Sequence, residues 1–469
     1  MPVPRNGSFR NASDARGMAA TLIRPRVGRR EPTHGDSRCA DVGSGTGDSG
    51  CGILIVTDRR FWNRSIGSET RIANLLSHLA RRREPIVVAY VGRLRRNERA
   101  ALDAFRHDAA RDLTILARRP EWRTVGATLA RSLRSLWPFR AVPGRIPESG
   151  PLSSPLRSPS ARRRFVETTI RTTRPRIVLV EFTRLAALVH PRPVLADPAP
   201  QYLLDTHDIL ARRVQPRSGS EGAAPADPWI AASAFDEIRA LEGFDVLIAI
   251  QGVEGALLRR QFPDKPVLVV PHGLDLPECP PSPCSSGGPI RLGFLGGRDP
   301  ANAEALDWFV ETVWPTLHAR FGARIAFDVG GQICRRWTKP PSGIRLVGTV
   351  DSIGDFWPKI DLAVNPVRSG SGLKIKNVEA LAHGRALVTT SIGAEGLESA
   401  SPDGLRIANG PDEWISTLAD WIASPASARR TARHGRAFFE AHLSADRAFA
   451  ELDAYLDRTL SHATGGAGP

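Results

Sequence analysis

Residues 361–397 contain the side chains with the most informative chemistry in the chain. This stretch, DLAVNPVRSGSGLKIKNVEALAHGRALVTTSIGAEGL, predicts a strand, a glycine-rich loop, a helix, a second strand and a second loop. Gly370, Ser371 and Gly372 stand where the first strand gives way to the helix. Glycines let the backbone approach a ligand closely, and a helix N-terminus offers free N–H groups and a partial positive charge. The pattern therefore predicts a cradle for a diphosphate.

Two charged residues after this loop suit the same ligand. Lys374 is placed to neutralise an outer phosphate, and Glu379, nearly two turns later, is placed to accept hydrogen bonds from the vicinal hydroxyls of a ribose. Only five of the 64 basic residues are lysines, so the spacing Lys374-x-Lys376 stands out, because lysine and arginine are not interchangeable at a tight phosphate site. Without the loop, the simplest interpretation of Glu379 would be a solvated residue on the face of a helix. The glycine-rich loop before it favours a role in binding the ribose.

The elements that position these residues alternate between short apolar runs and longer helical patterns. Strands are predicted at residues 51–57, 85–91, 113–117, 176–181, 202–205, 245–250 and 266–270, and again at 290–295, 324–329, 344–347, 362–365 and 386–390. Helices are predicted at residues 68–82, 302–321 and 373–383, and through most of 412–460. Several strands are apolar on consecutive residues, which is typical of parallel strands covered on both faces.

A Pro- and Ser-rich stretch at residues 277–289 separates two such βα halves. We therefore expect an α/β protein with two doubly wound, Rossmann-like domains that face each other across a cleft. The expected boundaries are a disordered leader at 1–50, an N-terminal Rossmann-like domain at 51–275, a linker at 276–289, a C-terminal Rossmann-like domain at 290–445, and a C-terminal helix and tail at 446–469 that can return to the first domain.

Composition excludes several classes of protein. The 469 residues are 41% hydrophobic, which rules out a wholly disordered chain, and no apolar run approaches the roughly 18–20 residues needed to cross a bilayer. The five cysteines form no CxxC pair, so neither a disulfide framework nor structural zinc is indicated. The leader lacks the apolar segment of a secretory signal, and we expect a cytoplasmic location.

Positive charge is concentrated between residues 51 and 164, where 24 arginines face nine acidic residues and give +15, the net charge of the whole chain. Such a field attracts phosphates, nucleic acid or anionic lipid, unless it only decorates a solvated surface. The arginine cluster carries no interleaved aromatic readout motif, which argues against nucleic acid. Within it, residues 120–143 carry a tryptophan-containing apolar stripe, which fits either a helix in a membrane interface or a helix packed on the first domain.

Residues 361–397 resemble the nucleotide-sugar site of the GT-B glycosyltransferases of family 4, the glycosyl transferases group 1. The resemblance extends over nearly the whole chain from about residue 51. It includes VPHGLD at 270–275, FLGGR at 294–298, GSETRIANLL at 67–76 and YLLDTHD at 202–208.

The resemblance implies a retaining glycosyltransferase that moves a sugar from a nucleoside-diphosphate donor to a glycan or lipid-linked acceptor. It implies a role in cell-surface or exopolysaccharide synthesis, in the cytoplasm or at the inner, anionic membrane face. It implies no cofactor and no metal, because basic side chains and a helix N-terminus replace the cation; the sequence has no Asp-x-Asp pair. A non-catalytic GT-B-like nucleotide- or membrane-binding protein is the alternative.

The resemblance also implies roles for single residues. In the C-terminal domain, Arg298 and Lys374 would face the diphosphate, the loop from Gly370 through Leu373 would offer backbone N–H groups, Glu379 would hold the ribose, and Glu395 would lie near the nucleotide or sugar. In the N-terminal domain, His207, with Asp208 as its rival, would orient the transferred sugar or the acceptor, and Gly67 would allow close approach of the β-phosphate or acceptor. The sequence departs from the family at two positions, Ser371 in place of its first glutamate and Asn302 in place of a common lysine.

Overall fold

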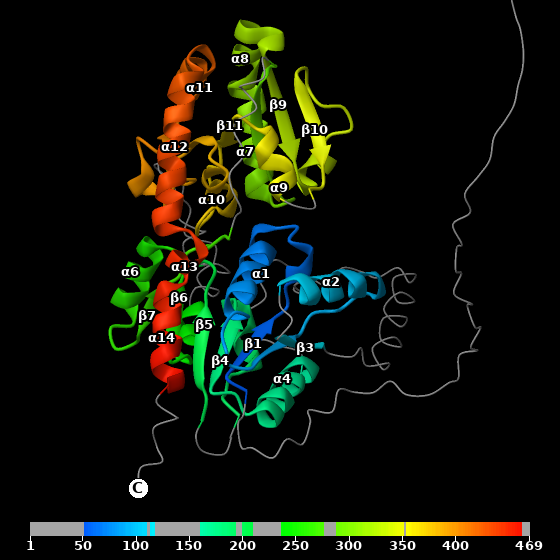
Figure 1. The fold of residues 1–469 in the computed structure, drawn as a ribbon, viewed down its shortest axis with the longest axis vertical. Helices are drawn as coiled ribbons and strands as arrows, with labels where there is room; N and C mark the ends of the chain where they lie inside the picture. Colours follow the sequence, from blue (N-terminus) through cyan, green and yellow to red (C-terminus); the bar gives the residue numbers. More distant parts are fainter. Residues whose placement is uncertain are drawn as a thin grey trace, which may run out of the picture. The chain divides into compact units, whose positions relative to one another are not determined.

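The computed structural model describes residues 51–109, 113–117, 160–193, 199–209, 236–275, 288–350 and 353–461. The predicted leader at 1–50, the apolar stripe at 120–143 and nearly all of the linker at 276–289 lie outside these ranges. Within them, the chain builds two parallel sheets with helices on their faces (Figure 1).

The first sheet has seven parallel strands in the order β3-β2-β1-β4-β5-β6-β7. They are β1 (Ile53–Thr57), β2 (Ile86–Tyr90), β3 (Leu113–Ala117), β4 (Ile177–Glu181), β5 (Gln201–Asp205), β6 (Val246–Ala249) and β7 (Val267–Val269). Strands β1, β2, β4 and β6 are buried at every position, as continuous apolar runs covered on both faces should be. The order reverses between β1 and β4, which is the switch point of a doubly wound sheet.

The second sheet has six parallel strands in the order β10-β9-β8-β11-β12-β13. They are β8 (Ile290–Leu295), β9 (Ile325–Gly330), β10 (Ile344–Gly348), β11 (Leu362–Asn365), β12 (Ala386–Thr389) and the two-residue β13 (Arg406–Ile407). Its order reverses between β8 and β11. The predicted α/β fold with two doubly wound sheets is thus confirmed; the exposed β13 is too short to be recognised by a pattern.

Helices connect the strands of each sheet. Those of the first half are α1 (Gly67–Leu79), α2 (Arg99–Ala109), α4 (Ser160–Thr173) and α6 (Gly252–Gln261). Those of the second half are α7 (Pro300–Thr312), α8 (Trp314–Phe321), α9 (Ile353–Phe356), α10 (Ile375–Ala382), α11 (Pro411–Ala423) and α12 (Pro425–His442), followed by α13 (Ala445–Ala448) and α14 (Ala450–Ser461). Among the residues described, no helix combines the length and the apolar character needed to span a membrane.

The prediction of one helix over 302–321 is wrong. Helix α7 begins earlier, at Pro300, where Asp299 accepts a hydrogen bond from Asn302 N–H and caps the helix. It ends at Thr312, and α8 starts at Trp314 with Pro315 in its first turn. A proline in the middle of a continuous helix would lack its N–H and clash with the preceding turn, so the helix breaks there.

The last two helices pack on the first sheet, not on the second. Phe449, Leu452, Leu456 and Leu460 are buried in one core with residues of β1, β2 and β6, and Figure 1 shows α14 beside this sheet. The second sheet has its own core, which includes the fully buried Trp414 of α11. The end of the chain therefore completes the domain with which the described part begins.

Candidate functional site

A cavity of about 1030 Å³ lies where the carboxyl ends of both sheets meet. Its walls come from the loops that follow β1, β4, β5 and β6 in the first sheet and β8, β9, β10 and β11 in the second. Ligands of doubly wound proteins bind outside the carboxyl ends of the strands, near the switch point. The cavity occupies this position for both sheets at once, and most of the predicted site residues line it, namely Gly67, His207, Asp208, Gly370, Ser371, Gly372, Leu373, Lys374 and Glu379.

The glycine loop between β11 and α10 is held in a conformation that needs glycine. Gly370 has φ +112° and Gly372 has φ +74°, a region that other residues rarely adopt. A Cβ on Gly372 would lie 3.1 Å from the main-chain oxygen of His207 and 3.2 Å from Cβ of Asp208. The Ser371 hydroxyl donates to Asp208 Oδ2 at 3.3 Å. The loop therefore reaches across the cavity and contacts the residues that follow β5.

Lys374 ties this loop to the start of α10. It is the N-cap residue of the helix, and its ammonium donates to the main-chain oxygens of Ser371 at 3.2 Å and Gly372 at 2.8 Å. The ammonium also lies 3.8 Å from Glu395 Oε2. Glu395 itself is half-buried and is not among the residues that line the cavity. In this structure Lys374 lines the cavity while holding the loop in shape.

Glu379 faces the cavity from the second turn of α10. Its side chain is buried, and Oε2 accepts a hydrogen bond from Trp357 Nε1 at 3.4 Å. Burial raises the pKa of the Glu379 carboxyl to about 7, against the opposing effects of Trp357 and of the nearby Lys376. A carboxylate in such a place can accept hydrogen bonds from a ligand's hydroxyls, and it has few protein donors to compete with them.

Lys376 is a cavity residue that the sequence analysis noticed but did not assign. Its ammonium hydrogen-bonds Asn302 Oδ1 and lies 4.3 Å from the centre of the Phe294 ring. No carboxylate lies within ion-pair distance of it in the described part of the chain, and burial lowers its pKa to about 8. A partly buried ammonium of this kind, on the wall of a cavity, suits an anionic ligand.

Arg298, which the resemblance would place at the diphosphate, does not line the cavity in this structure. The residue is exposed, although its neighbours Gly297 and Asp299 line the cavity. Lys376 of α10 instead reaches Asn302, the position at which the resemblance leads one to expect a lysine. The sequence could not show that Lys376 reaches Asn302, because this contact depends on the distance in space between two residues of different helices.

Gly67 begins α1 and touches the other domain. A Cβ on Gly67 would lie 3.0 Å from Cδ1 of Ile375, the first residue of α10. The close approach at Gly67 in this structure is therefore to α10, next to the glycine loop, and the predicted approach of a phosphate or acceptor to Gly67 is not tested.

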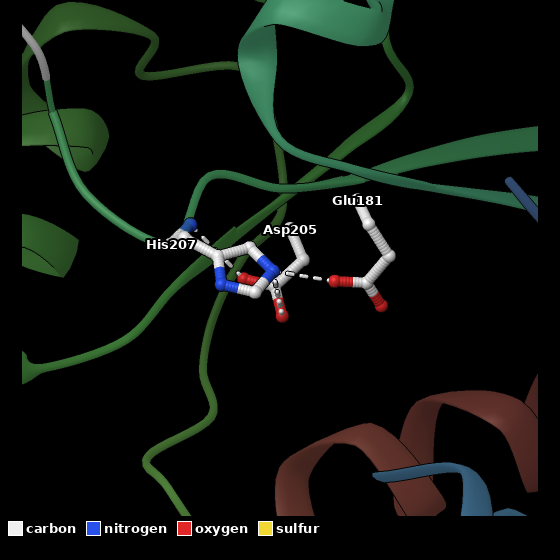
Figure 2. A group of neighbouring side chains, drawn as sticks. All are labelled: Glu181, Asp205 and His207. Carbon is white, nitrogen blue, oxygen red and sulfur yellow. Dashed lines mark hydrogen bonds and ion pairs between the residues drawn. The ribbon is translucent and has the colours of Figure 1, made fainter. Parts of the chain in front are cut away.

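On the side of the first sheet, His207 stands in a hydrogen-bonded network. Its Nε2 lies 2.5 Å from Glu181 Oε2 and 4.0 Å from Asp205 Oδ2. Figure 2 shows both carboxylates on the Nε2 side of the ring. Its ring stacks on Phe182 with 3.7 Å between ring centres. Burial, with the positive charge of Arg71, lowers the pKa of His207 well below its usual value, and burial raises that of Glu181 well above.

Glu181, Asp205 and His207 are also the one group of described residues close enough together to hold a metal ion. One carboxylate oxygen of each acid and Nε2 of the histidine already have partners in the protein. Arg71 donates to Asp205 Oδ2 from Nε at 3.1 Å and from Nη2 at 2.7 Å, and Glu181 pairs with His207. Positive charge from Arg71, next to the cluster, opposes a cation as well. We therefore interpret the group as a hydrogen-bonded network.

Glu181, Asp205 and Arg71 were not predicted as site residues from the sequence. A usable signal for the two acids was present, since each is the last residue of an apolar, buried strand, and such positions meet at the ligand-binding edge of a parallel sheet. Arg71 gave no signal, because it lies on α1 within a segment full of arginines. Its pairing with Asp205 spans 134 residues of sequence.

Comparisons with known proteins agree with this geometry. Residues 289–424 match the family model of Glycosyl transferases group 1. No curated protein matches the chain by sequence.

Among solved structures, the chain is similar to a mutant of TarM from S. aureus in complex with UDP, alpha-GlcNAc-glycerol and fondaparinux, with TM-score 0.61, 8% identity, and coverage of 87% of this chain and 100% of TarM. It is similar to sucrose-phosphate synthase from Thermosynechococcus elongatus, with TM-score 0.59, 14% identity, and coverage of 88% and 100%. It is also similar to HepE from Anabaena in complex with UDP and glucose, with TM-score 0.55, 12% identity, and coverage of 89% and 100%.

At such identities these likenesses show the fold alone, and the family match covers residues 289–424 of the chain. The two parallel sheets and the cavity at their carboxyl ends are those of a GT-B protein. The chain thus has the GT-B fold, and its residues 289–424 match the family model of the glycosyl transferases group 1.

Proposed function

We propose that the protein transfers a sugar from a nucleoside-diphosphate donor to an acceptor hydroxyl, with the donor held against the second sheet. The observation that carries the proposal is the meeting of the glycine loop, Lys376 and Glu379 in one cavity. The loop and the start of α10 supply N–H groups, Lys376 supplies positive charge, and Glu379 supplies a hydrogen-bond acceptor for ribose hydroxyls. The N–H groups and the positive charge suit the diphosphate of a nucleoside diphosphate, and the acceptor suits its ribose.

The reaction breaks the bond between the anomeric carbon and the β-phosphate oxygen. The acceptor oxygen takes its place at that carbon, and the acceptor's proton leaves with the nucleoside diphosphate or to water. Negative charge grows on the β-phosphate as the bond breaks, so cations that are already in position there stabilise the transition state. Loss of one such group would lower the rate by about 10²–10³-fold.

Finer features of the proposal rest on the family and on the neighbouring structures. We propose a family 4 enzyme that retains the anomeric configuration and needs no metal, since Lys374, Lys376 and the N-terminus of α10 can balance the diphosphate. We propose a glycan or lipid-linked acceptor, bound on the side of the first sheet, and a role in cell-surface polysaccharide synthesis, with work at the inner membrane face. Similar structures hold UDP with glucose or with a glycerol glycoside of GlcNAc, which supports the donor class.

The test is a screen of UDP-, GDP- and ADP-sugars for slow hydrolysis and for thermal stabilisation of the chain, with and without a chelator. We expect one donor class to be hydrolysed, with equal rates in EDTA. Proton NMR of the freshly formed sugar would show the configuration of the donor if the transfer is retaining. The proposal would be contradicted if none of the sugar donors were hydrolysed and no nucleotide stabilised the chain.

A non-catalytic GT-B protein is the second candidate, because Ser371 stands where the family has an acidic residue. The structure gives Ser371 a contact of its own, since its hydroxyl donates to Asp208 Oδ2 at 3.3 Å. A non-catalytic protein would bind a nucleotide and turn over no donor, so the same screen separates the two.

A further inference from the structure

His207 and Glu181 form a close pair at the carboxyl ends of the neighbouring strands β5 and β4. The 2.5 Å between His207 Nε2 and Glu181 Oε2 requires a proton between the two atoms, because two bare acceptors would repel each other at that distance. Figure 2 shows Nε2 turned toward Glu181 and Nδ1 on the other side of the ring. The pair thus fixes which nitrogen is left for a ligand.

The imidazole has little freedom to turn. Its ring lies parallel to Phe182, at an interplanar angle of 10°, and the guanidinium of Arg184 lies 3.8 Å from the centre of the Phe182 ring. His207 has φ +60°, and its main-chain N–H donates to Asp205 Oδ1 at 3.2 Å. His207 lines the cavity, and within the described residues its Nδ1 makes no hydrogen bond.

The surroundings decide how many protons the pair holds. The charged groups that face it are Asp205 on β5, Arg71 on α1, Arg184 after β4 and Arg59 after β1, with the buried His272 after β7. The guanidinium groups of the three arginines disfavour a positive charge on the His207 ring. Glu181 is 0% exposed, and its Oε1 has no partner among the described residues, which disfavours an ionised carboxylate.

We propose that Glu181 is a positioning residue, whose protonated carboxyl donates to His207 Nε2 and thereby presents Nδ1–H to the cavity as a hydrogen-bond donor. The receiver would be an oxygen of the transferred sugar or of the acceptor, so this role rests on the proposed function. Burial, which raises the pKa of Glu181 and lowers that of His207, favours the same protonation state.

A definite consequence follows for the tautomer of the histidine. When Glu181 loses its proton, the neutral ring of His207 changes tautomer. Its single N–H proton is then on Nε2 and no longer on Nδ1, and Nε2 donates to the carboxylate. Nδ1 is left with a lone pair and becomes an acceptor. One proton on a residue of β4 thus decides whether His207 donates to the ligand or accepts from it. Glu181 lies outside the matched family region, residues 289–424.

The direct test is NMR of the chain labelled with ¹⁵N-histidine, with the His207 signals assigned by their loss in His207→Gln. At pH 7 we expect a neutral ring protonated at Nδ1 in the wild type and in Glu181→Gln, whose amide N–H also donates to Nε2. In Glu181→Leu the donor is lost, and the ring should change to the Nε2–H form. An Nε2–H ring or an imidazolium in the wild type at pH 7 would overturn the proposal, and so would an unchanged ring in Glu181→Leu.

Kinetics with the active donor provide the second test. The pH dependence that other titrating groups give to kcat/KM is common to both proteins, so it cancels in the ratio of the wild-type value to that of Glu181→Gln. We expect it to stay constant up to the pH at which NMR shows the wild-type ring change tautomer, and then to fall. Glu181→Leu should lose about ten- to hundredfold in kcat/KM. A ratio that stays constant through the tautomer change would overturn the proposal.

A matched control is Glu254→Gln, which alters another fully buried glutamate, on α6, away from the cavity. It should leave the His207 signals unchanged; a change as large as that in Glu181→Leu would show a merely structural effect and overturn the proposal. Thermal stabilisation by Zn²⁺ or Mn²⁺ in the wild type, lost in Glu181→Gln, would overturn it in favour of a metal site. If the NMR results hold and no donor is turned over, the positioning stands and the proposed function fails.

Discussion

Lys376 and Glu379 lie one helical turn apart on α10 and both face the cavity. Burial moves their pKa values toward each other, to about 8 for the lysine and about 7 for the glutamate. Both are charged together only in a narrow window around pH 7–8. Because a diphosphate needs the ammonium and ribose hydroxyls need the carboxylate, nucleotide affinity should be greatest in that window.

Substitution of Lys376 tests the alkaline side of the window. Above pH 8 the lysine of the free protein is increasingly neutral, and since a bound diphosphate favours the ammonium, binding should take up a proton and weaken. Calorimetry of UDP binding in buffers of different ionisation enthalpy measures this uptake. Lys376→Met should bind UDP about 10–100-fold more weakly and show no uptake, whereas Lys339→Met, at an exposed lysine, should match the wild type. Equal affinity in all three would exclude Lys376 from the phosphate site.

At the scale of elements, the loop between β11 and α10 gives the site its shape. The sequence predicted its strand, its glycines and its helix correctly, because each has a local signal. It could not predict that Lys374 would bond to the loop's own carbonyls, or that Gly372 would touch the residues after β5. Those features depend on the approach of the two sheets, which no local pattern records.

Gly372→Ala tests the loop. A side chain here is strained by φ +74° and would lie 3.1 Å from the His207 carbonyl oxygen, so the loop must shift. We expect about 1–3 kcal/mol lower stability by denaturant unfolding and at least tenfold weaker nucleotide binding by calorimetry. Gly252→Ala is the control, because a Cβ there would meet nothing within 4 Å. If Gly372→Ala binds as well as the control, the shape of the loop does not matter for the ligand.

At the scale of the whole molecule, the chain returns to its first sheet through α13 and α14. Leu274, which follows β7, accepts a main-chain hydrogen bond from Ala445 at 3.2 Å and donates one to Leu443 at 3.3 Å. The sequence predicted a helical tail that can return to the first domain. It could not identify the strands that the tail covers, because an amphipathic helix shows which of its faces is apolar and not what that face packs against.

Leu456→Ala tests this packing. The side chain is 2% exposed within the core of the first sheet, and its removal should lower the free energy of unfolding by about 2–5 kcal/mol. Val347→Ala, at a valine that is 42% exposed on β10, should change it by less than about 0.5 kcal/mol. Chemical denaturation followed by circular dichroism measures both. A loss at Leu456 no larger than at Val347 would mean that α14 does not stabilise the first sheet.

The site residues that could be predicted are those with a signal in the neighbouring sequence, and those that could not depend on contacts between residues far apart in the sequence. Glu379 and the glycine loop were predicted to lie together because they share one short stretch of sequence, and both line the cavity. Arg298 was assigned by resemblance, and it lies outside the cavity. Glu181 was missed because its meaning depends on His207, 26 residues away. Residues that act as pairs across strands are visible only in the fold.

In the proposed function, the glycine loop and Glu379 hold a nucleoside diphosphate, with the ribose hydroxyls on the Glu379 carboxylate. Calorimetry of UDP and of 2′,3′-dideoxy-UDP, or of the GDP pair if the guanine nucleotide binds, tests it most directly when run on the wild type and on Glu379→Gln at pH 7.5. We expect the wild type to bind the ribonucleotide at least tenfold more tightly than its dideoxy analogue, and Glu379→Gln to bind the two nearly equally. The same preference for the ribonucleotide in both proteins, or no binding by the wild type, would contradict this arrangement.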